Sequence, residues 1–204
     1  MNIAVLASHG GTTLQAVLDA CAQGAIAGRV TLVISNNASC GALERARRAQ
    51  VPVQHLSGRT HPDPAALDRA IRDALIGSAA DIVLLAGYMK KLGPATLAAF
   101  SGRVLNTHPA LLPKFGGRGM YGEHVHRAVL AAHEAVTGAS VHRVDENYDT
   151  GAVIAQVTVP VEPQDTPQTL AARVQQSERQ LVVRVLAEIA QQGAPARQTK
   201  DTPT

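Results

Sequence analysis

The pattern of hydrophobic and polar positions predicts alternating strands and helices in the first half of the chain. Short runs of aliphatic residues alternate with longer Ala-rich stretches of helical periodicity, and the run Ile82–Leu85 lacks the polar alternation of a half-exposed strand. The expected strands are Asn2–Ala7, Val30–Ser35, Asp81–Leu85 and Arg103–Thr107, and the expected helices are about Thr13–Ala22, Gly41–Ala49, Pro64–Ile76 and Pro94–Phe100. This alternation is typical of a Rossmann-like α/β fold, an open, mostly parallel sheet with helices on both faces.

The second half has a different rhythm. The Gly-rich segment Phe115–Gly122 predicts a loop, and a short helix is expected at about His124–His133. Two strands follow, joined by a turn-rich connection, and a long helix ends the pattern; the predicted ranges are Ala139–Val144, Asp145–Gly151, Ala152–Val159 and Pro167 to about Gln191. We expect one domain over residues 1–190 and a disordered tail over 191–204, which has few hydrophobic residues.

Composition supports an ordinary globular enzyme. The 204 residues fit one domain, with 46% hydrophobic and 17% charged residues and no apolar run long enough to cross a bilayer. The first residues lack the pattern of a signal peptide, so we expect a cytoplasmic protein without a membrane partner. Cys21 and Cys40 are far apart, not in metal-ligand spacing, and are expected to be free thiols.

The charge pattern does not favour nucleic acid as a partner. A formal charge of +3 is small, the arginines are spread along the chain, and three Tyr, two Phe and no Trp give little for bases to stack on. Small-molecule partners are therefore expected, and both a monomer and a homodimer stay open.

The first candidate site is the loop after the first strand, Ser8–Gln15. Ligands of open α/β sheets bind beyond the carboxyl ends of the strands, and free amides at a helix start favour anions. Gly10 and Gly11 allow a phosphate to approach the backbone, while Thr12 and Thr13 add hydroxyl groups. Neither the third glycine of a dinucleotide fingerprint nor the lysine of a P-loop is present. The alternative is a tight strand–helix turn in which Thr12 is the N-cap.

The second candidate site is the end of the fourth expected strand. Asn106 and His108 lie two residues apart in extended backbone, so their side chains point to the same side. An amide beside an imidazole can stabilise an oxyanion and donate a proton. The alternative is that both side chains only bond the neighbouring loop, which Pro109 and Pro113 make rigid.

A carboxylate near His108 would raise the pKa of its imidazole and favour the charged form. Asp149 supplies that carboxylate if its loop folds over His108, with Asp145 and Glu146 as competing candidates. Gly151 would let this loop pass close to a ligand. The other histidines considered, at positions 124, 126, 133 and 142, lack a metal-ligand spacing, so we expect isolated, hydrogen-bonded histidines and no metal.

Taken together, these motifs carry a resemblance to a known family. They are the Gly-Gly-Thr-Thr-Leu-Gln loop, Ser35-Asn36, Leu85–Met89, Leu105–Pro113, Thr137–His142, Asp149-Thr150-Gly151 with Ile154-Ala155-Gln156, and Arg173-Val174-Gln175 followed by Glu178. Over about residues 1 to 190 the chain resembles the phosphoribosylglycinamide formyltransferases. The resemblance implies transfer of a formyl group from 10-formyltetrahydrofolate, as co-substrate and without a metal, to the amine of glycinamide ribonucleotide in purine biosynthesis.

The resemblance also implies a role for each matched residue. Asn106, His108 and Asp149 would be catalytic. Substrate would be bound by the residues Gly11, Thr12, Thr13, Met89, Pro109 and Glu178, with the phosphate at the glycine loop and the ribose hydroxyls at Glu178. Folate would be bound by the residues Met89, Lys90, Leu92, Asp145, Glu146, Asn147, Tyr148 and Asp149.

The chain departs from the family pattern at a few of these positions. His9 stands where Gly is usual, Thr12-Thr13 replaces Ser-Asn, Lys90 replaces a frequent Arg, and Gln175 replaces the Lys of some members. Without an amide at position 13 or a Lys at position 175, phosphate binding would rest more on backbone amides. Lys at position 90 weakens any bidentate contact to folate.

Two alternatives to this function stay open. One is an enzyme on the same scaffold, either a formyltransferase for a different amine or a formyltetrahydrofolate hydrolase. Methionyl-tRNA formyltransferases and the hydrolases carry an additional domain, which this chain of 204 residues is expected to lack. The other is a non-catalytic nucleotide-binding module, which the joint presence of Asn106, His108 and Asp149 disfavours.

Overall fold

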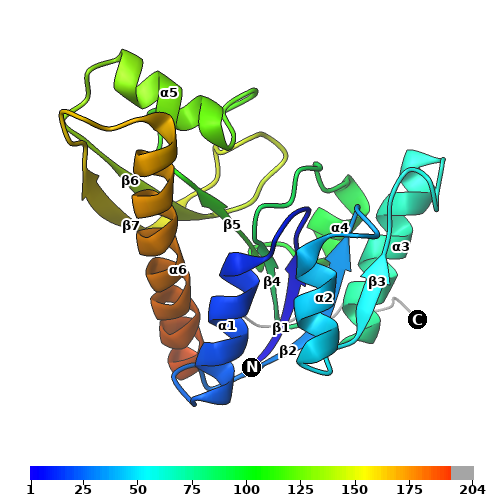
Figure 1. Ribbon diagram of the computed structural model, residues 1–204. Helices are drawn as coiled ribbons and strands as arrows, with labels where there is room; N and C mark the ends of the chain where they lie inside the picture. Colours follow the sequence, from blue (N-terminus) through cyan, green and yellow to red (C-terminus); the bar gives the residue numbers. More distant parts are fainter. Residues whose placement is uncertain (194–204) are drawn as a thin grey trace.

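The computed structural model describes residues 1–193, and these form an open sheet of seven strands with helices on both faces (Figure 1). The strand order is β3-β2-β1-β4-β5-β6-β7, in which the first five strands are parallel and β6 and β7 are antiparallel. The strands are β1 (Asn2–Leu6), β2 (Arg29–Ser35), β3 (Val53–His55), β4 (Ile82–Leu85), β5 (Val104–His108), β6 (Val136–Arg143) and β7 (Val153–Pro160). The α/β fold predicted from the sequence is confirmed.

Helices cover the sheet in two unequal layers. Their bounds are α1 (Thr12–Ala22), α2 (Gly41–Arg48), α3 (Pro64–Gly77), α4 (Pro94–Ala99), α5 (Glu123–Ala131) and α6 (Pro167–Gln192). One core cluster joins the sheet to α1, α2, α5 and α6, and a second joins it to α3 and α4. The long α6 lies beside α1, α5 and β6 (Figure 1).

The predicted elements agree with the structure to within a few residues, with one omission. The edge strand β3 was missed because three residues give no periodicity to read. The predicted disordered tail begins at residue 191, but α6 continues to Gln192, and residues 194–204 lie outside the described part. Cys21 and Cys40 are both free, as predicted.

Burial explains why the central strands are uniformly apolar. All four residues of β4 are buried, and so are four of the five in β1. Because helices cover both faces here, each of these buried side chains enters one of the two core clusters. Among residues 1–193, no helix combines the length and apolarity needed to cross a membrane.

Candidate active site

The loop between β1 and α1 is shaped by one glycine. Gly11 is the N-cap of α1 in the left-handed conformation, with φ 72° and ψ 33°, and no side chain caps the helix. A Cβ at Gly11 would lie 2.7 Å from Cα of Ala42, so α2 packs directly on this turn. The alternative in which Thr12 is the N-cap is wrong, because Thr12 is already the first helical residue. The first amides of α1 are therefore not taken by a capping side chain.

A buttressing arginine places positive charge beside this loop. Arg45 of α2 donates from Nε to the Gly10 carbonyl at 2.8 Å and from a terminal nitrogen to Oε1 of Gln15 at 3.0 Å. Both contacts fix the loop against two helices. An anion at the start of α1 would thus meet helix amides next to a guanidinium.

The second group of polar side chains comes from the antiparallel pair β5 and β6. In the strand register, Asn106 pairs with His142 and His108 pairs with Ser140. The Nδ2 atom of Asn106 lies 3.1 Å from Nε2 of His142. Because residues two apart share one face, this register brings both polar pairs to the same side of the sheet.

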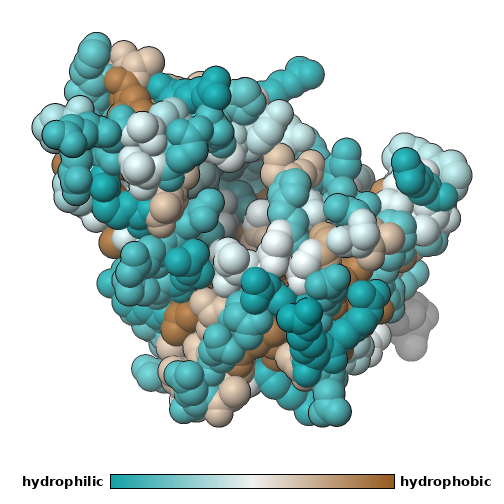
Figure 2. Space-filling model, in the orientation of Figure 1, coloured by the Kyte–Doolittle hydropathy of each residue, from teal (hydrophilic) through white to brown (hydrophobic). Residues whose placement is uncertain are grey.

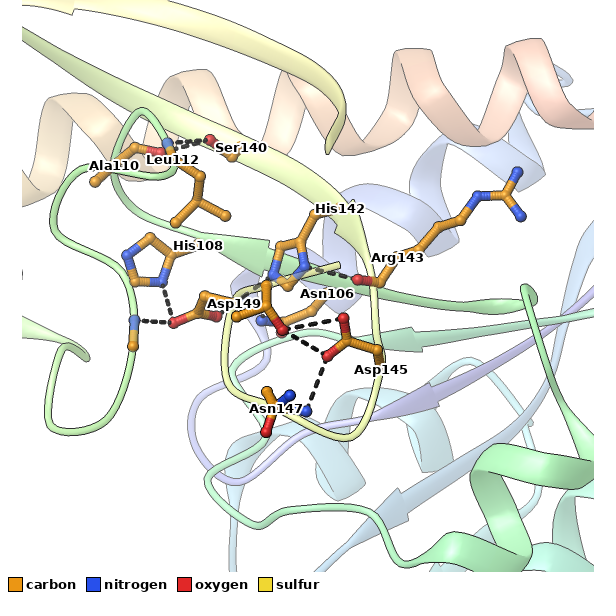
Figure 3. A network of polar contacts seen from close by, with 12 residues as sticks. Asn106, His108, Ala110, Leu112, Ser140, His142, Arg143, Asp145, Asn147 and Asp149 are labelled. Carbon is orange, nitrogen blue, oxygen red and sulfur yellow. Dashed lines mark hydrogen bonds and ion pairs between the residues drawn. The ribbon is translucent and has the colours of Figure 1, made fainter. Parts of the chain in front are cut away.

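Asp149 joins the two histidines of this cluster. Its carboxylate lies 3.4 Å from Nδ1 of His108 and 3.5 Å from Nε2 of His142, and it also accepts the Gly117 amide at 2.9 Å. Figure 3 shows Asp149 between the two imidazoles, with Asn106 close to His142. The structure thus confirms that the loop after β6 folds over His108 and that Asp149 is the carboxylate facing it.

Asp145 and Glu146 do not take that place. The carboxylate of Asp145 accepts the amide of Asn147 at 2.9 Å and the hydroxyl of Thr150 at 2.8 Å, so it stabilises its own loop. Both acidic residues are exposed. Gly151 has a different role from the predicted one, because a Cβ there would lie 1.9 Å from the Arg143 carbonyl oxygen. This glycine allows close passage of two backbone segments.

Two acceptors of His108 belong to residues with strained backbone. Nε2 of His108 lies 2.7 Å from the carbonyl oxygen of Phe115, and Nδ1 faces Asp149. Phe115 has φ 56° and Asp149 has φ 58°, a left-handed region that costs most residues about 1–2 kcal/mol. Strain of this kind persists where the surroundings hold it, often at functional sites.

Opposing effects of the surroundings set the pKa of His108. Burial lowers the pKa of His108, Asp149 and the Phe115 carbonyl raise it, and nearby His142 lowers it, with a net result below the ordinary value. The expected net rise in the His108 pKa is therefore wrong, although the effect of Asp149 has the predicted sign. For Asp149, burial raises the pKa, but contacts with His142, His108 and the Gly117 amide outweigh it, so the pKa is lowered and the carboxylate stays ionised.

The remaining histidines divide into two kinds. His142 is not isolated, because it contacts both Asn106 and Asp149. His126 is buried on α5, its Nδ1 has no hydrogen-bond partner, and its pKa is lowered mainly by burial. Across residues 1–193, no three His, Cys, Asp or Glu side chains are grouped to hold a metal ion.

Ser140 holds the segment that follows β5. Its hydroxyl donates to the Ala110 carbonyl at 2.6 Å and accepts the Leu112 amide at 3.1 Å (Figure 3). It also accepts the side-chain amide of Gln156 at 2.8 Å. Sequence reasoning gave Ser140 and His142 no role of their own. The available signal was the pair of polar residues two apart, flanking Val141, in a strand with small and apolar neighbours.

Glu178 of α6 links the two groups of polar residues. Its Oε1 accepts the hydroxyl of Thr13 at 3.2 Å and the hydroxyl of Thr107 at 3.1 Å. Thr13 lies in the first turn of α1, and Thr107 lies between Asn106 and His108 on β5. The glycine loop and strand β5 are therefore joined through one carboxylate.

The residues expected to bind folate have unequal access to a ligand. The side chain of Met89 is 39% exposed, and its amide donates to the Ser8 hydroxyl at 2.8 Å. Lys90 lines a cavity of about 450 Å³ together with Asn36 and Tyr88. Leu92 is only 4% exposed and packs in the core beneath α3, so its side chain has little surface to offer.

The loop of Asp145 to Asp149 lies next to the segment after β4. Nζ of Lys91 is 5.7 Å from the centroid of the Tyr148 ring, which is a cation–π contact. The molecular surface is hollowed between the part carrying α5 and α6 and the part carrying α2 and α3 (Figure 2). The predicted catalytic, phosphate and folate residues come from loops, strand ends and the first turn of α1 around the carboxyl edge of the sheet, and among them Leu92 has a buried side chain.

Comparison with known proteins agrees with this geometry. Residues 1–186 match the family described as formyl transferase. Phosphoribosylglycinamide formyltransferase of Escherichia coli (strain K12) is 40% identical over 92% of this chain and 86% of its own length. The chloroplastic phosphoribosylglycinamide formyltransferase of Arabidopsis thaliana is 38% identical over 99% of this chain and 72% of its own length. The crystal structure of glycinamide ribonucleotide transformylase 1 from Symbiobacterium toebii superposes with a TM-score of 0.88 and 39% identity, covering 97% of this chain and 92% of that one.

Proposed function

This chain belongs to the formyl transferase family, and from that premise we propose that it moves a formyl group from 10-formyltetrahydrofolate to the amine of glycinamide ribonucleotide. The reaction is a step of purine biosynthesis. The observation that supports it best is the cluster of Asn106, His108 and Asp149, assembled from β5 and the loop after β6. Amide and imidazole N–H groups can stabilise the oxyanion of an acyl transfer, and a carboxylate can assist the movement of a proton.

The chemistry follows from where charge develops. The amine of the nucleotide attacks the formyl carbon, its new C–N bond forms, and the formyl oxygen becomes negatively charged. Asn106 and a protonated His108 stabilise that oxyanion. The tetrahedral intermediate then expels the folate nitrogen, which takes up a proton, while the attacking amine loses one. Asp149 assists this transfer of the proton through water.

His108 must change its contacts during this reaction. In the unliganded structure Nε2 is bonded to the Phe115 carbonyl and Nδ1 faces Asp149, so no ring N–H is directed at a substrate. The shorter contact, to Phe115, is the one that opens. A developing oxyanion then replaces the carbonyl as acceptor and offsets the burial that lowers the His108 pKa.

The substrate roles follow the same edge of the sheet. The phosphate binds the first amides of α1 at Gly11 and Thr12, next to Arg45. Glu178 takes the ribose hydroxyls, and Pro109 follows the catalytic strand. Folate occupies the side of Met89, Lys90 and the loop from Asp145 to Asp149, with Leu92 supporting this wall from the core. A cytoplasmic location and a monomeric or homodimeric state stay predictions.

A turnover assay tests this function. The purified protein is mixed with 10-formyltetrahydrofolate, with and without glycinamide ribonucleotide, and the folate product is followed by absorbance. We expect turnover that requires the nucleotide. Deformylation of the folate at an equal rate without the nucleotide would indicate a hydrolase. Turnover only with another amine would indicate a different acceptor. No reaction with any acceptor would favour the binding module.

A further inference from the structure

Strand β5 directs its polar side chains to both faces of the sheet. Asn106 and His108 point to one face, and Thr107, between them, points to the other together with Leu105. On that face lies α6, from which Glu178 reaches the Thr107 hydroxyl at 3.1 Å. A hydroxyl residue is unusual there, because Leu105, on the same face, packs into the core cluster formed with α1, α5 and α6.

Thr13 reaches the same atom from the glycine loop. Its hydroxyl donates to Oε1 of Glu178 at 3.2 Å, so both threonines bond one carboxylate oxygen. A hydroxyl has a single proton to donate, and here Thr13 directs it to Glu178. The Thr13 side chain therefore serves the carboxylate, and its backbone amide remains for a phosphate.

The second oxygen of Glu178 is left for something else. Within residues 1–193, Oε2 makes no hydrogen bond, although a carboxylate accepts several. Burial raises the pKa of Glu178, whereas the hydroxyls of Thr107 and Thr13 and the charge of Arg179 lower it without cancelling the effect of burial. Oε2 is not among the buried atoms that lack a hydrogen-bond partner in residues 1–193, so solvent and the donors of a ligand can reach it.

We propose that Thr13 and Thr107 are positioning residues that hold Oε1 of Glu178, so that Oε2 faces the adjacent hydroxyls of the nucleotide's sugar. This inference rests on the proposed function, since it deepens the role of Glu178 in binding glycinamide ribonucleotide. Through Glu178, the two threonines fix the position of the sugar relative to the phosphate and to the amine that reacts. One comes from the phosphate loop and the other lies between the two catalytic residues of β5, so the three parts of the substrate are placed relative to one another.

The test uses valine, which keeps the branched shape of threonine and removes the hydroxyl. Thr107→Val and Thr13→Val are each compared with wild type in kcat and in KM for glycinamide ribonucleotide. Losing one such hydrogen bond corresponds to about a three- to tenfold rise in KM, with kcat within about twofold. Thr107→Ser keeps the hydroxyl and should restore KM. Thr31→Val is the matched control, because its hydroxyl makes only a 3.5 Å contact on β2, outside the site.

A second readout separates positioning from a merely structural effect. For wild type, kcat/KM is measured on glycinamide ribonucleotide and on its 2-deoxyribosyl analogue, and the ratio of the two values is taken. The Glu178→Gln variant gives the same ratio for a protein without the carboxylate. We expect Thr107→Val and Thr13→Val to shift the ratio of kcat/KM values from that of wild type towards that of Glu178→Gln. A general loss of stability would lower kcat/KM equally for both substrates and leave the ratio unchanged.

The outcomes distinguish the two proposals. A wild-type protein that does not use glycinamide ribonucleotide at all would remove the proposed function, and this inference with it. A wild-type protein that turns over normally, with both valine variants unchanged in KM and in the ratio, would overturn this inference alone. Thr107→Ser behaving like Thr107→Val would also overturn it.

Discussion

The two ends of the site are built in different ways. The proposed phosphate end is made by regular elements: a glycine N-cap, the first turn of α1, and Arg45 of α2 hydrogen-bonded to the loop. The transfer end is made largely by loops, whose residues Phe115 and Asp149 have left-handed backbone and provide acceptors for His108. The other members of this cluster, Asn106, His108 and His142, lie on β5 and β6.

This difference indicates what each end is for. A phosphate has a fixed charge and shape, so a preformed ring of amides binds it without rearrangement. Formyl transfer moves a proton and creates a charge, so the groups around His108 have to exchange partners. We expect changes at the phosphate end to alter stability and KM, and changes at the transfer end to alter kcat and pH dependence.

The largest expected effect is at the transfer end. Asn106→Ala and His108→Ala should each lower kcat by about a hundred- to thousandfold, because each removes a donor to the oxyanion. Far-ultraviolet circular dichroism should show the fold retained. His133→Asn, at an exposed histidine beyond α5, is the control that should keep kcat. If kcat of either alanine variant stayed within about threefold of the wild-type value, the substituted residue would have no part in the mechanism.

Gly11→Ala tests the role of the glycine N-cap at the proposed phosphate end. A side chain at φ 72° costs about 1–2 kcal/mol, and its clash with Ala42 adds about 1–3 kcal/mol. We expect a loss of about 2–5 kcal/mol in the free energy of unfolding, measured by urea denaturation, and a higher KM for the nucleotide.

Gly24→Ala is the matched control for Gly11→Ala. Gly24 has φ 74°, but a Cβ there would meet nothing within 4 Å. It should therefore show the backbone cost of about 1–2 kcal/mol alone and leave KM unchanged. Equal losses in the two variants would mean that contact with α2 does not shape the phosphate loop.

The smallest expected effect is on the pH dependence of stability. Burial lowers the pKa of His108, so near its ordinary value of about 6.5 the folded state binds fewer protons than the unfolded state. Its contribution is fully present above that pH and is lost as pH falls towards the lowered pKa, by at most about 1.4 kcal/mol per pH unit.

His108→Gln should reduce this loss. Urea denaturation between pH 7.5 and 5.5 should show a smaller fall in the free energy of unfolding for the variant than for wild type. The pKa of His126 is also lowered mainly by burial, so His126 accounts for part of the remaining fall. The double variant His108→Gln/His126→Gln should therefore show a still smaller change of the free energy of unfolding with pH. An unchanged slope in His108→Gln would show that His108 is not kept neutral by burial.

Periodicity and local chemistry determined most of the fold. Uniformly apolar runs such as Ile82–Leu85 identify strands buried on both faces, and the glycines after β1 identify a tight turn at the carboxyl edge. The alternation of side chains along a strand also predicted that Asn106 and His108 share a side. These properties are local, so the chain needs no tertiary contact to reveal them.

Contacts between distant segments were decided only by the tertiary structure. The register of β5 with β6 places His142 opposite Asn106, and loop closure selects Asp149 over Asp145. Burial outweighs the effect of Asp149 on the His108 pKa, because desolvation depends on every element packed around the imidazole. Glu178 meets Thr13 and Thr107 across 165 and 71 residues of sequence, a distance at which no local pattern carries information.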